Sequence, residues 1–124
     1  SIFLSELANE SFLNENYLEA IRLYEEAISV NDKEYVFYEN AAISYDNVKN
    51  YERATEYFDK VIYDFKSEDG RAEFFKGLML IKLEDDLKGC EYLLASAQKN
   101  YIGRVSSLKA SDVYIALCIN NINN

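Results

Sequence analysis

The side chains of this chain that could do chemistry are carboxylates, tyrosines and two cysteines, because the sequence contains no histidine. Without histidine there is no Ser-His or Cys-His pair and no imidazole base. The four glycines are scattered through the chain, so they form no glycine-rich phosphate loop. We therefore expect neither enzymatic activity nor a cofactor.

Two adjacent acidic pairs, Glu25/Glu26 and Asp85/Asp86, are the candidates for acid–base or metal chemistry. Neighbouring residues on a helix point about 100° apart, so Glu25 and Glu26 cannot easily share one site. Asp85 and Asp86 fall in a predicted turn, where helix capping explains their presence. We interpret both pairs as structural or solvent-facing, and no metal site is expected.

Cys90 and Cys118 are the two cysteines of the chain, and their spacing matches no zinc signature. Our first interpretation is that both are small buried hydrophobic residues. The alternative is a disulfide, which requires the two Cα atoms to lie within about 7 Å. The compartment stays open: we favour the cytoplasm, with a periplasmic or secreted location as the alternative if an N-terminal leader has been removed.

The 124-residue chain has a net charge of −9, and its acidic residues are concentrated in the first half. Residues 1–70 hold 6 basic and 16 acidic side chains, whereas residues 71–124 hold 7 basic and 6 acidic ones. Nucleic acids and anionic membrane surfaces require clustered Lys and Arg, so we expect neither as a partner. No apolar run approaches the ~18 residues of a membrane span, so no membrane insertion is expected. A basic protein partner fits this charge, although acidic surfaces also serve solubility.

Apolar residues recur at three- and four-residue spacing along most of the chain, which predicts amphipathic helices. The absence of proline also favours long helices. The predicted helices cover about 2–13, 17–30, 34–48, 51–64, 71–83, 87–99 and 106–119. Asn16 is a candidate N-cap for the second helix, with Glu19 completing a capping box.

The segment that contains the second predicted helix recurs along the chain. Residues 16–28 return 34 residues later as residues 50–62, and return again, with less similarity, as residues 86–97. In each copy a small residue stands four positions before a large one, as Ala20/Tyr24, Ala54/Phe58 and Cys90/Leu94. A small residue lets two helices approach closely, and the large residue fills the groove beside it. A period of about 34 residues indicates stacked helix pairs, and a plain helical bundle is the alternative.

The first helix of each pair repeats a second pattern. Its copies are Leu4-x2-Leu7-Ala8-x2-Ser11, Tyr38-x2-Ala41-Ala42-x2-Tyr45 and Phe74-x2-Gly77-Leu78-x2-Ile81. Together with the small–large pairs, these positions resemble the tetratricopeptide repeat. The closing proline of that family's pattern is missing from every copy, and the third copy departs furthest from it.

The resemblance implies an all-α fold of about seven helices, in which antiparallel helix-turn-helix repeats stack as a right-handed α-solenoid. Three repeats would cover residues 1–102, at about 1–34, 35–68 and 71–102, and a capping helix would cover residues 105–120. In this family the first helix of each repeat lines a concave groove that holds a peptide or a partner helix. Carried over by alignment, the groove residues are Asn9, Phe12, Leu13, Glu39, Asn40, Ile43, Asp46, Asn47, Phe75, Lys76, Met79 and Lys82.

This set of groove residues mixes apolar side chains with amides, acids at its centre and lysines at one end. Such a surface suits a peptide with an apolar residue and opposite charges at its two ends. Some members of the family hold an acidic C-terminal peptide through a carboxylate clamp, and Asn9, Asn40 and Lys76 fall on matching positions. Ser5 and Ala72 occupy the other two basic positions, which argues against a working clamp.

We therefore expect a non-catalytic protein–protein interaction scaffold that binds a peptide or protein segment in the groove. The alternative is a structural spacer or self-association module of a larger protein or complex, which includes a homo-oligomer.

Overall fold

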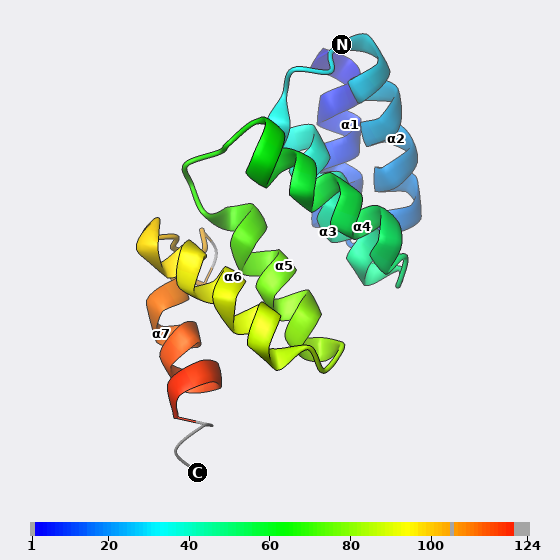
Figure 1. Cartoon of the computed structure of the whole chain (residues 1–124). Helices are drawn as coiled ribbons and strands as arrows, with labels where there is room; N and C mark the ends of the chain where they lie inside the picture. The colour runs from blue at the N-terminus through cyan, green and yellow to red at the C-terminus, as the bar shows by residue number, and fades with distance from the viewer. Residues whose placement is uncertain (1, 105, 121–124) are drawn as a thin grey trace. The chain divides into compact units, whose positions relative to one another are not determined.

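The computed structural model describes residues 2–104 and 106–120, and every regular element within these ranges is a helix (Figure 1). The elements are α1 (Ile2–Leu13), α2 (Tyr17–Val30), α3 (Tyr35–Asn47), α4 (Tyr51–Asp59), the π-helical turn η1 (Lys60–Asp64), α5 (Arg71–Lys82), α6 (Asp86–Gln98), α7 (Ala110–Tyr114) and the π-helical turn η2 (Ile115–Ile119). The predicted all-α fold of about seven helices is confirmed for the described part of the chain. One compact unit ends at Lys66 and a second begins at Ser67.

The first unit contains α1 to α4 and η1, arranged as consecutive antiparallel helices (Figure 1). Its core includes Ala8, Ala20, Leu23, Tyr24 and Ala41, which are at most 5% exposed. Ala20 and Tyr24 are both fully buried, as are Ala54 and Phe58 at the equivalent positions of α4. The recurring small–large pairs of these two repeats therefore hold helices together, as the sequence pattern indicates.

Three turns of the chain share the same left-handed backbone conformation. Glu15, Lys49 and Glu84 each adopt a positive φ, of 61°, 65° and 67°, two residues after the ends of α1, α3 and α5. In each turn the next residue donates its backbone amide to a carbonyl near the end of the preceding helix. Asn16, for example, donates to the Ser11 carbonyl at 2.8 Å. This left-handed turn sends each second helix back along the first, so the helices of a pair are antiparallel.

The second unit contains a close crossing of α5 and α6 at two glycines. A Cβ atom built on Gly77 would lie 2.9 Å from the Gly89 carbonyl oxygen and 2.9 Å from Leu93 Cγ. Gly89 is buried and Leu93 is fully buried, whereas Leu94 is 38% exposed. The small–large pair of the third copy is therefore Gly89/Leu93, one residue earlier than the Cys90/Leu94 pair that the sequence indicated. The register shifts because α5 is one residue shorter than α3, so α6 begins one residue earlier in the third copy.

The C-terminal helix begins at Ala110, later than the expected start near residue 106. The described residues before it lie close together instead: Gly103 donates its amide to the Leu108 carbonyl at 2.9 Å, and Ile102 forms an antiparallel bridge with Lys109. The helix packs on the core of Phe74 and Leu93 through Ala110 and Cys118. Residue 105, where the expected capping helix starts, lies outside the described residues.

Side-chain caps were predicted correctly at one position and wrongly at another. Asp85 accepts a hydrogen bond from the Lys88 amide at 3.4 Å, as expected for a helix cap. Asn16 makes no capping hydrogen bond, and Glu19 forms an ion pair with Arg22 rather than closing a capping box. The Asn16 side chain borders a cleft between α1 and α2 instead.

Candidate functional site

The groove residues predicted on α1 differ in their surroundings. Leu13 is 76% exposed, and Phe12 is half-buried with its ring edge against Tyr17 and Tyr24. Asn9 is exposed as a residue, but its Oδ1 accepts a hydrogen bond from the Tyr24 hydroxyl at 2.5 Å. The Asn9 amide is therefore held by the scaffold at one of its atoms.

The groove residues predicted on α3 are mostly buried. Glu39, Asn40 and Ile43 are 1%, 7% and 5% exposed. Asn40 donates from Nδ2 to the Tyr24 hydroxyl at 2.9 Å, so Tyr24 links the two asparagines that matched the clamp positions. Asp46 is half-buried and Asn47 is exposed, which leaves the C-terminal end of α3 open to a partner.

The groove residues predicted on α5 lie in the second unit. Lys76 is 5% exposed, and its Nζ lies 4.2 Å from the ring centroid of Tyr92 and donates to the Tyr92 hydroxyl at 2.9 Å. Met79 is 1% exposed and Phe75 is half-buried against Phe74, whereas Lys82 is exposed. Across the three helices, the predicted groove residues open to a partner are therefore Asn9, Leu13, Asn47 and Lys82.

A cluster around Arg53 joins α2, α3 and α4, and no sequence pattern indicated it. Arg53 Nη2 lies 3.4 Å from Glu25 Oε1, and its guanidinium lies 5.6 Å from the Tyr45 ring centroid and 5.1 Å from that of Tyr57. The Tyr57 hydroxyl donates to Glu25 at 3.1 Å, and the Tyr45 hydroxyl donates to the same oxygen. These contacts give Tyr45 and Tyr57 a structural role in holding α2, α3 and α4 together.

Burial and the nearby Glu25 carboxylate raise the pKa of both tyrosines in this cluster. For Tyr57 the pKa lies well above its ordinary value, first because burial disfavours the phenolate and then because of the Glu25 charge. For Tyr45 burial again comes first in raising the pKa, followed by the hydrogen bond to Glu25. Both hydroxyls are therefore held as neutral donors to Glu25 and have no role as bases near neutral pH.

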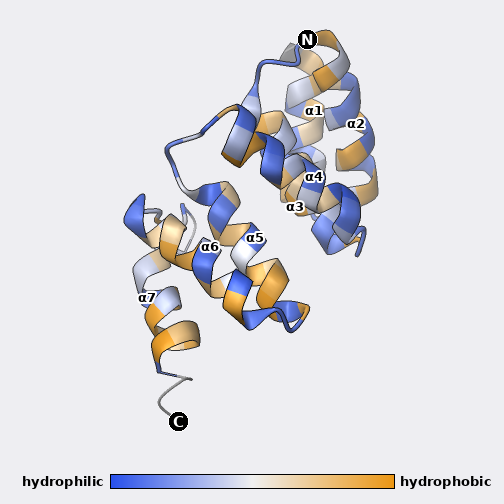
Figure 2. Ribbon diagram, in the orientation of Figure 1, coloured by the Kyte–Doolittle hydropathy of each residue, from blue (hydrophilic) through white to orange (hydrophobic). Residues whose placement is uncertain are grey.

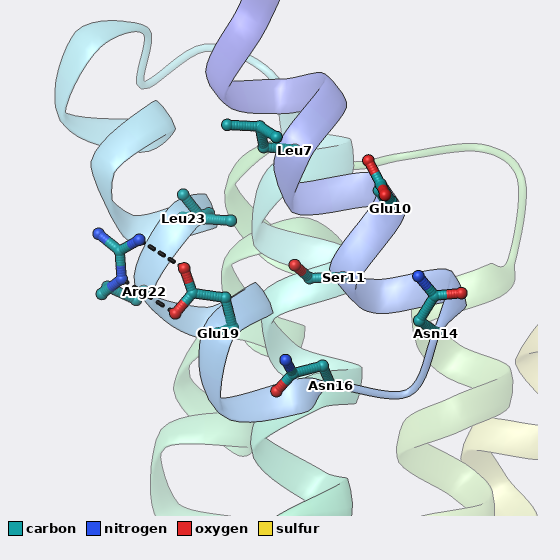
Figure 3. Close-up of a pocket in the computed structure, with 8 residues that line it drawn as sticks. All are labelled: Leu7, Glu10, Ser11, Asn14, Asn16, Glu19, Arg22 and Leu23. Atoms are coloured by element: carbon teal, nitrogen blue, oxygen red, sulfur yellow. Dashed lines mark hydrogen bonds and ion pairs between the residues drawn. The ribbon is translucent and has the colours of Figure 1, made fainter.

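The cleft between α1 and α2 has a volume of about 250 Å³ (Figure 3). Its lining residues are Leu7, Glu10, Ser11, Asn14, Asn16, Glu19, Arg22 and Leu23. Figure 3 shows Leu7 and Leu23 facing each other across one end, with Asn16 at the other end by the turn. Pockets for drug-sized ligands are larger, at about 300–1,000 Å³. The cleft is therefore smaller than a typical pocket for a drug-sized ligand.

Neither a metal site nor a thiol site is apparent in the part of the chain that the structure describes. No group of three or more His, Cys, Asp or Glu side chains is placed to hold a metal ion within residues 2–104 and 106–120. Cys90 and Cys118 form a disulfide, with their Cα atoms 5.8 Å apart. The disulfide alternative for the two cysteines is therefore the one that the structure adopts. None of the described helices is long and apolar enough to cross a membrane.

No protein-family model and no curated protein matches the chain.

Proposed function

We propose that this chain is a non-catalytic binding module that holds a peptide or protein segment on the first helices of its repeats. The observation that supports the proposal is the division of roles between positions. The recurring residues Ala20, Tyr24, Ala54 and Phe58 are fully buried, so recurrence marks the scaffold. The positions that differ between copies include exposed ones such as Leu13 and Lys82, where a partner can be selected.

A random peptide library displayed on phage tests this proposal for a partner of any sequence. Peptides enriched on the wild-type chain are measured by isothermal titration against Leu13→Glu and Lys82→Glu. We expect each substitution to weaken binding by about tenfold or more, since Leu13→Glu introduces a charge on α1 and Lys82→Glu reverses a charge on α5. The matched control is Leu87→Glu on α6, which changes a leucine that is 80% exposed and lies outside the predicted groove.

Two outcomes would contradict the proposal. Failure to enrich any peptide, or equal weakening by Leu87→Glu, would mean that the first helices carry no binding site. Thermal unfolding of each variant separates loss of contact from loss of fold, because exposed substitutions change stability by only about 0.5 kcal/mol.

The apolar side of the C-terminal helix favours a second candidate function, self-association. Residues 113–119 contain no charged side chain, and η2 is apolar around its circumference (Figure 2). Ile115 and Ile119 are 47% and 40% exposed. Helices that are apolar on all sides are normally covered. Sedimentation equilibrium over a concentration series tests this function, and a monomer at millimolar concentration contradicts it.

A further inference from the structure

The cleft between α1 and α2 lies on a different side of α1 from the proposed groove. With 3.6 residues per turn, Leu7, Ser11 and Asn14 face roughly opposite to Asn9 and Phe12. The cleft is therefore a site separate from the proposed groove, and a ligand can bind it whether or not the groove holds a partner.

The two ends of the cleft differ in chemistry. Leu7 and Leu23 supply apolar walls at one end, while Ser11 and Asn16 supply polar groups toward the turn (Figure 3). Asn16 makes no capping hydrogen bond, so its amide is not committed to the start of α2. A ligand that fits both ends has an apolar stem and a polar head, as an arginine or lysine side chain has.

The charges around the cleft select a cation. Residues 1–30 contain six acidic side chains and a single basic one, Arg22. Glu10 and Glu19 both line the cleft, one from each helix. Arg22 binds Glu19 through two of its nitrogens, Nε at 3.1 Å and Nη2 at 2.5 Å. The Glu19 carboxylate is thus already oriented for the forked geometry of a guanidinium.

The ion pair of Glu19 and Arg22 is open to exchange. The Arg22 side chain is 59% exposed and the Glu19 side chain is 40% exposed. Exposed ion pairs contribute little, because water and salt screen them and the long side chains lose freedom. Arg22 also lies 3.5 Å from Glu26, which can retain it when Glu19 changes partner.

We propose that the α1–α2 cleft binds an arginine side chain of a partner segment, with its stem against Leu7 and the exposed edge of Leu23 and its guanidinium on Glu19. The incoming guanidinium replaces Arg22, which stays with Glu26. The partner is accordingly a basic protein segment, in keeping with the negative charge of the first unit.

Two blocked tripeptides test the site directly: acetyl-Gly-Arg-Leu-amide and its citrulline analogue, which has the same shape without the charge. Each is titrated into the ¹⁵N-labelled chain and followed by two-dimensional NMR. We expect the arginine peptide to shift the resonances of Ser11, Asn16 and Leu23 in a saturable manner. The citrulline peptide should bind at least about fivefold more weakly.

Two substitutions of the ion pair are expected to act in opposite directions. Glu19→Gln removes the acceptor and should weaken binding of the arginine peptide by about fivefold, whereas Arg22→Gln removes the competitor and should tighten it by about threefold. The control is Glu6→Gln, which removes an exposed charge from α1 outside the cleft and should change affinity by less than about twofold.

Several results would overturn the proposal. Equal weakening by Glu6→Gln and Glu19→Gln would show diffuse attraction to an acidic surface. Shifts that spread over the first unit without saturating, or equal binding of the citrulline peptide, would show the absence of a guanidinium site. Weaker binding to Arg22→Gln would show that Arg22 supports the cleft and does not compete for it.

Discussion

The Tyr24 hydroxyl joins three helices of the first unit. It donates to Asn9 on α1 and accepts from Asn40 on α3, at 2.5 and 2.9 Å. The Tyr24 ring that carries this hydroxyl is fully buried. Alignment to a peptide-binding family suggested that the two asparagines face a ligand, but one polar atom of each is used within the protein. At residue scale, the sequence predicted the burial of Tyr24 and missed what its hydroxyl does, because hydrogen-bond partners depend on three-dimensional placement.

Replacing Tyr24 by Phe should lower the free energy of unfolding by about 1–2 kcal/mol, because both asparagines lose a hydrogen bond inside or beside the core. Urea unfolding followed by circular dichroism measures this change. The matched control is Tyr17→Phe on the same helix, at a half-buried ring. A change below about 0.5 kcal/mol for Tyr24→Phe would show that the hydroxyl bridge contributes nothing to stability.

The raised pKa of Tyr57 predicts sensitivity of the first unit to alkaline pH. An unfolded tyrosine ionises near pH 10, whereas the folded chain keeps the Tyr57 proton because of burial and the Glu25 charge. The folded state therefore binds more protons than the unfolded state above that pH, and stability falls as pH rises. This contribution is fully present below about pH 10 and is lost above it.

The measurement is urea unfolding of the wild type and Tyr57→Phe at about pH 9 and about pH 11.5, on either side of the ordinary tyrosine pKa. Over this interval the free energy of unfolding of Tyr57→Phe should rise, relative to that of the wild type, by about 1 kcal/mol after allowance for solvent screening. Tyr63→Phe, at a ring that is 56% exposed, is the control for general alkaline effects. A difference between wild type and Tyr57→Phe that does not vary with pH would contradict the assignment.

At the scale of the elements, periodicity predicted the helices well, because each helix buries one apolar stripe and ends at a short turn. The observed bounds of α1 and α2 match those expected. The third repeat was the weak point, since two adjacent residues, Gly89 and Cys90, could each serve as the small position. Burial resolves this choice: Leu93 is fully buried, and its partner four residues earlier is Gly89. Sequence alone could not separate these registers, because both satisfy the same spacing rule.

The crossing of α5 and α6 predicts that Gly77→Ala destabilises the second unit. The added methyl would lie 2.9 Å from the Gly89 carbonyl oxygen, which belongs to backbone and cannot move aside cheaply. We expect a loss of about 1–3 kcal/mol, despite the better helix propensity of alanine. Gly103→Ala is the control, because its nearest neighbour is the rotatable Ser106 hydroxyl at 3.1 Å. Unchanged thermal unfolding of Gly77→Ala would show that the two helices can separate freely.

At the scale of the whole molecule, the chain consists of two compact units that differ in charge and in covalent structure. The first unit carries most of the acidic residues, and the second contains the disulfide between Cys90 and Cys118. The sequence left the pairing of the cysteines open, because residues 28 apart in sequence are brought together only by the packing of the C-terminal helix on α6. The same reason explains why the α1–α2 cleft was missed: its lining comes from two helices whose mutual placement sets its shape.

The disulfide predicts that reduction weakens one unit and leaves the other intact. Closing a loop of 28 residues stabilises a fold by about 3–4 kcal/mol in the chain-entropy account. The helical segment it fastens, Ala110–Ile119, is also too short to persist alone, since isolated helices below about 12 residues are marginal in water. Hydrogen exchange with mass spectrometry, before and after reduction, measures the effect segment by segment.

On reduction, amides of α6, α7 and η2 should lose protection by about two orders of magnitude, while those of α1 to α4 keep theirs. The control is the Cys90→Ala/Cys118→Ala double variant, which should show the reduced pattern and ignore the reductant. Equal loss of protection in both units would mean that the chain unfolds as one cooperative block. Unchanged protection of α7 and η2 would mean that apolar packing through Ala110, Val113 and Leu117 suffices without the covalent bond.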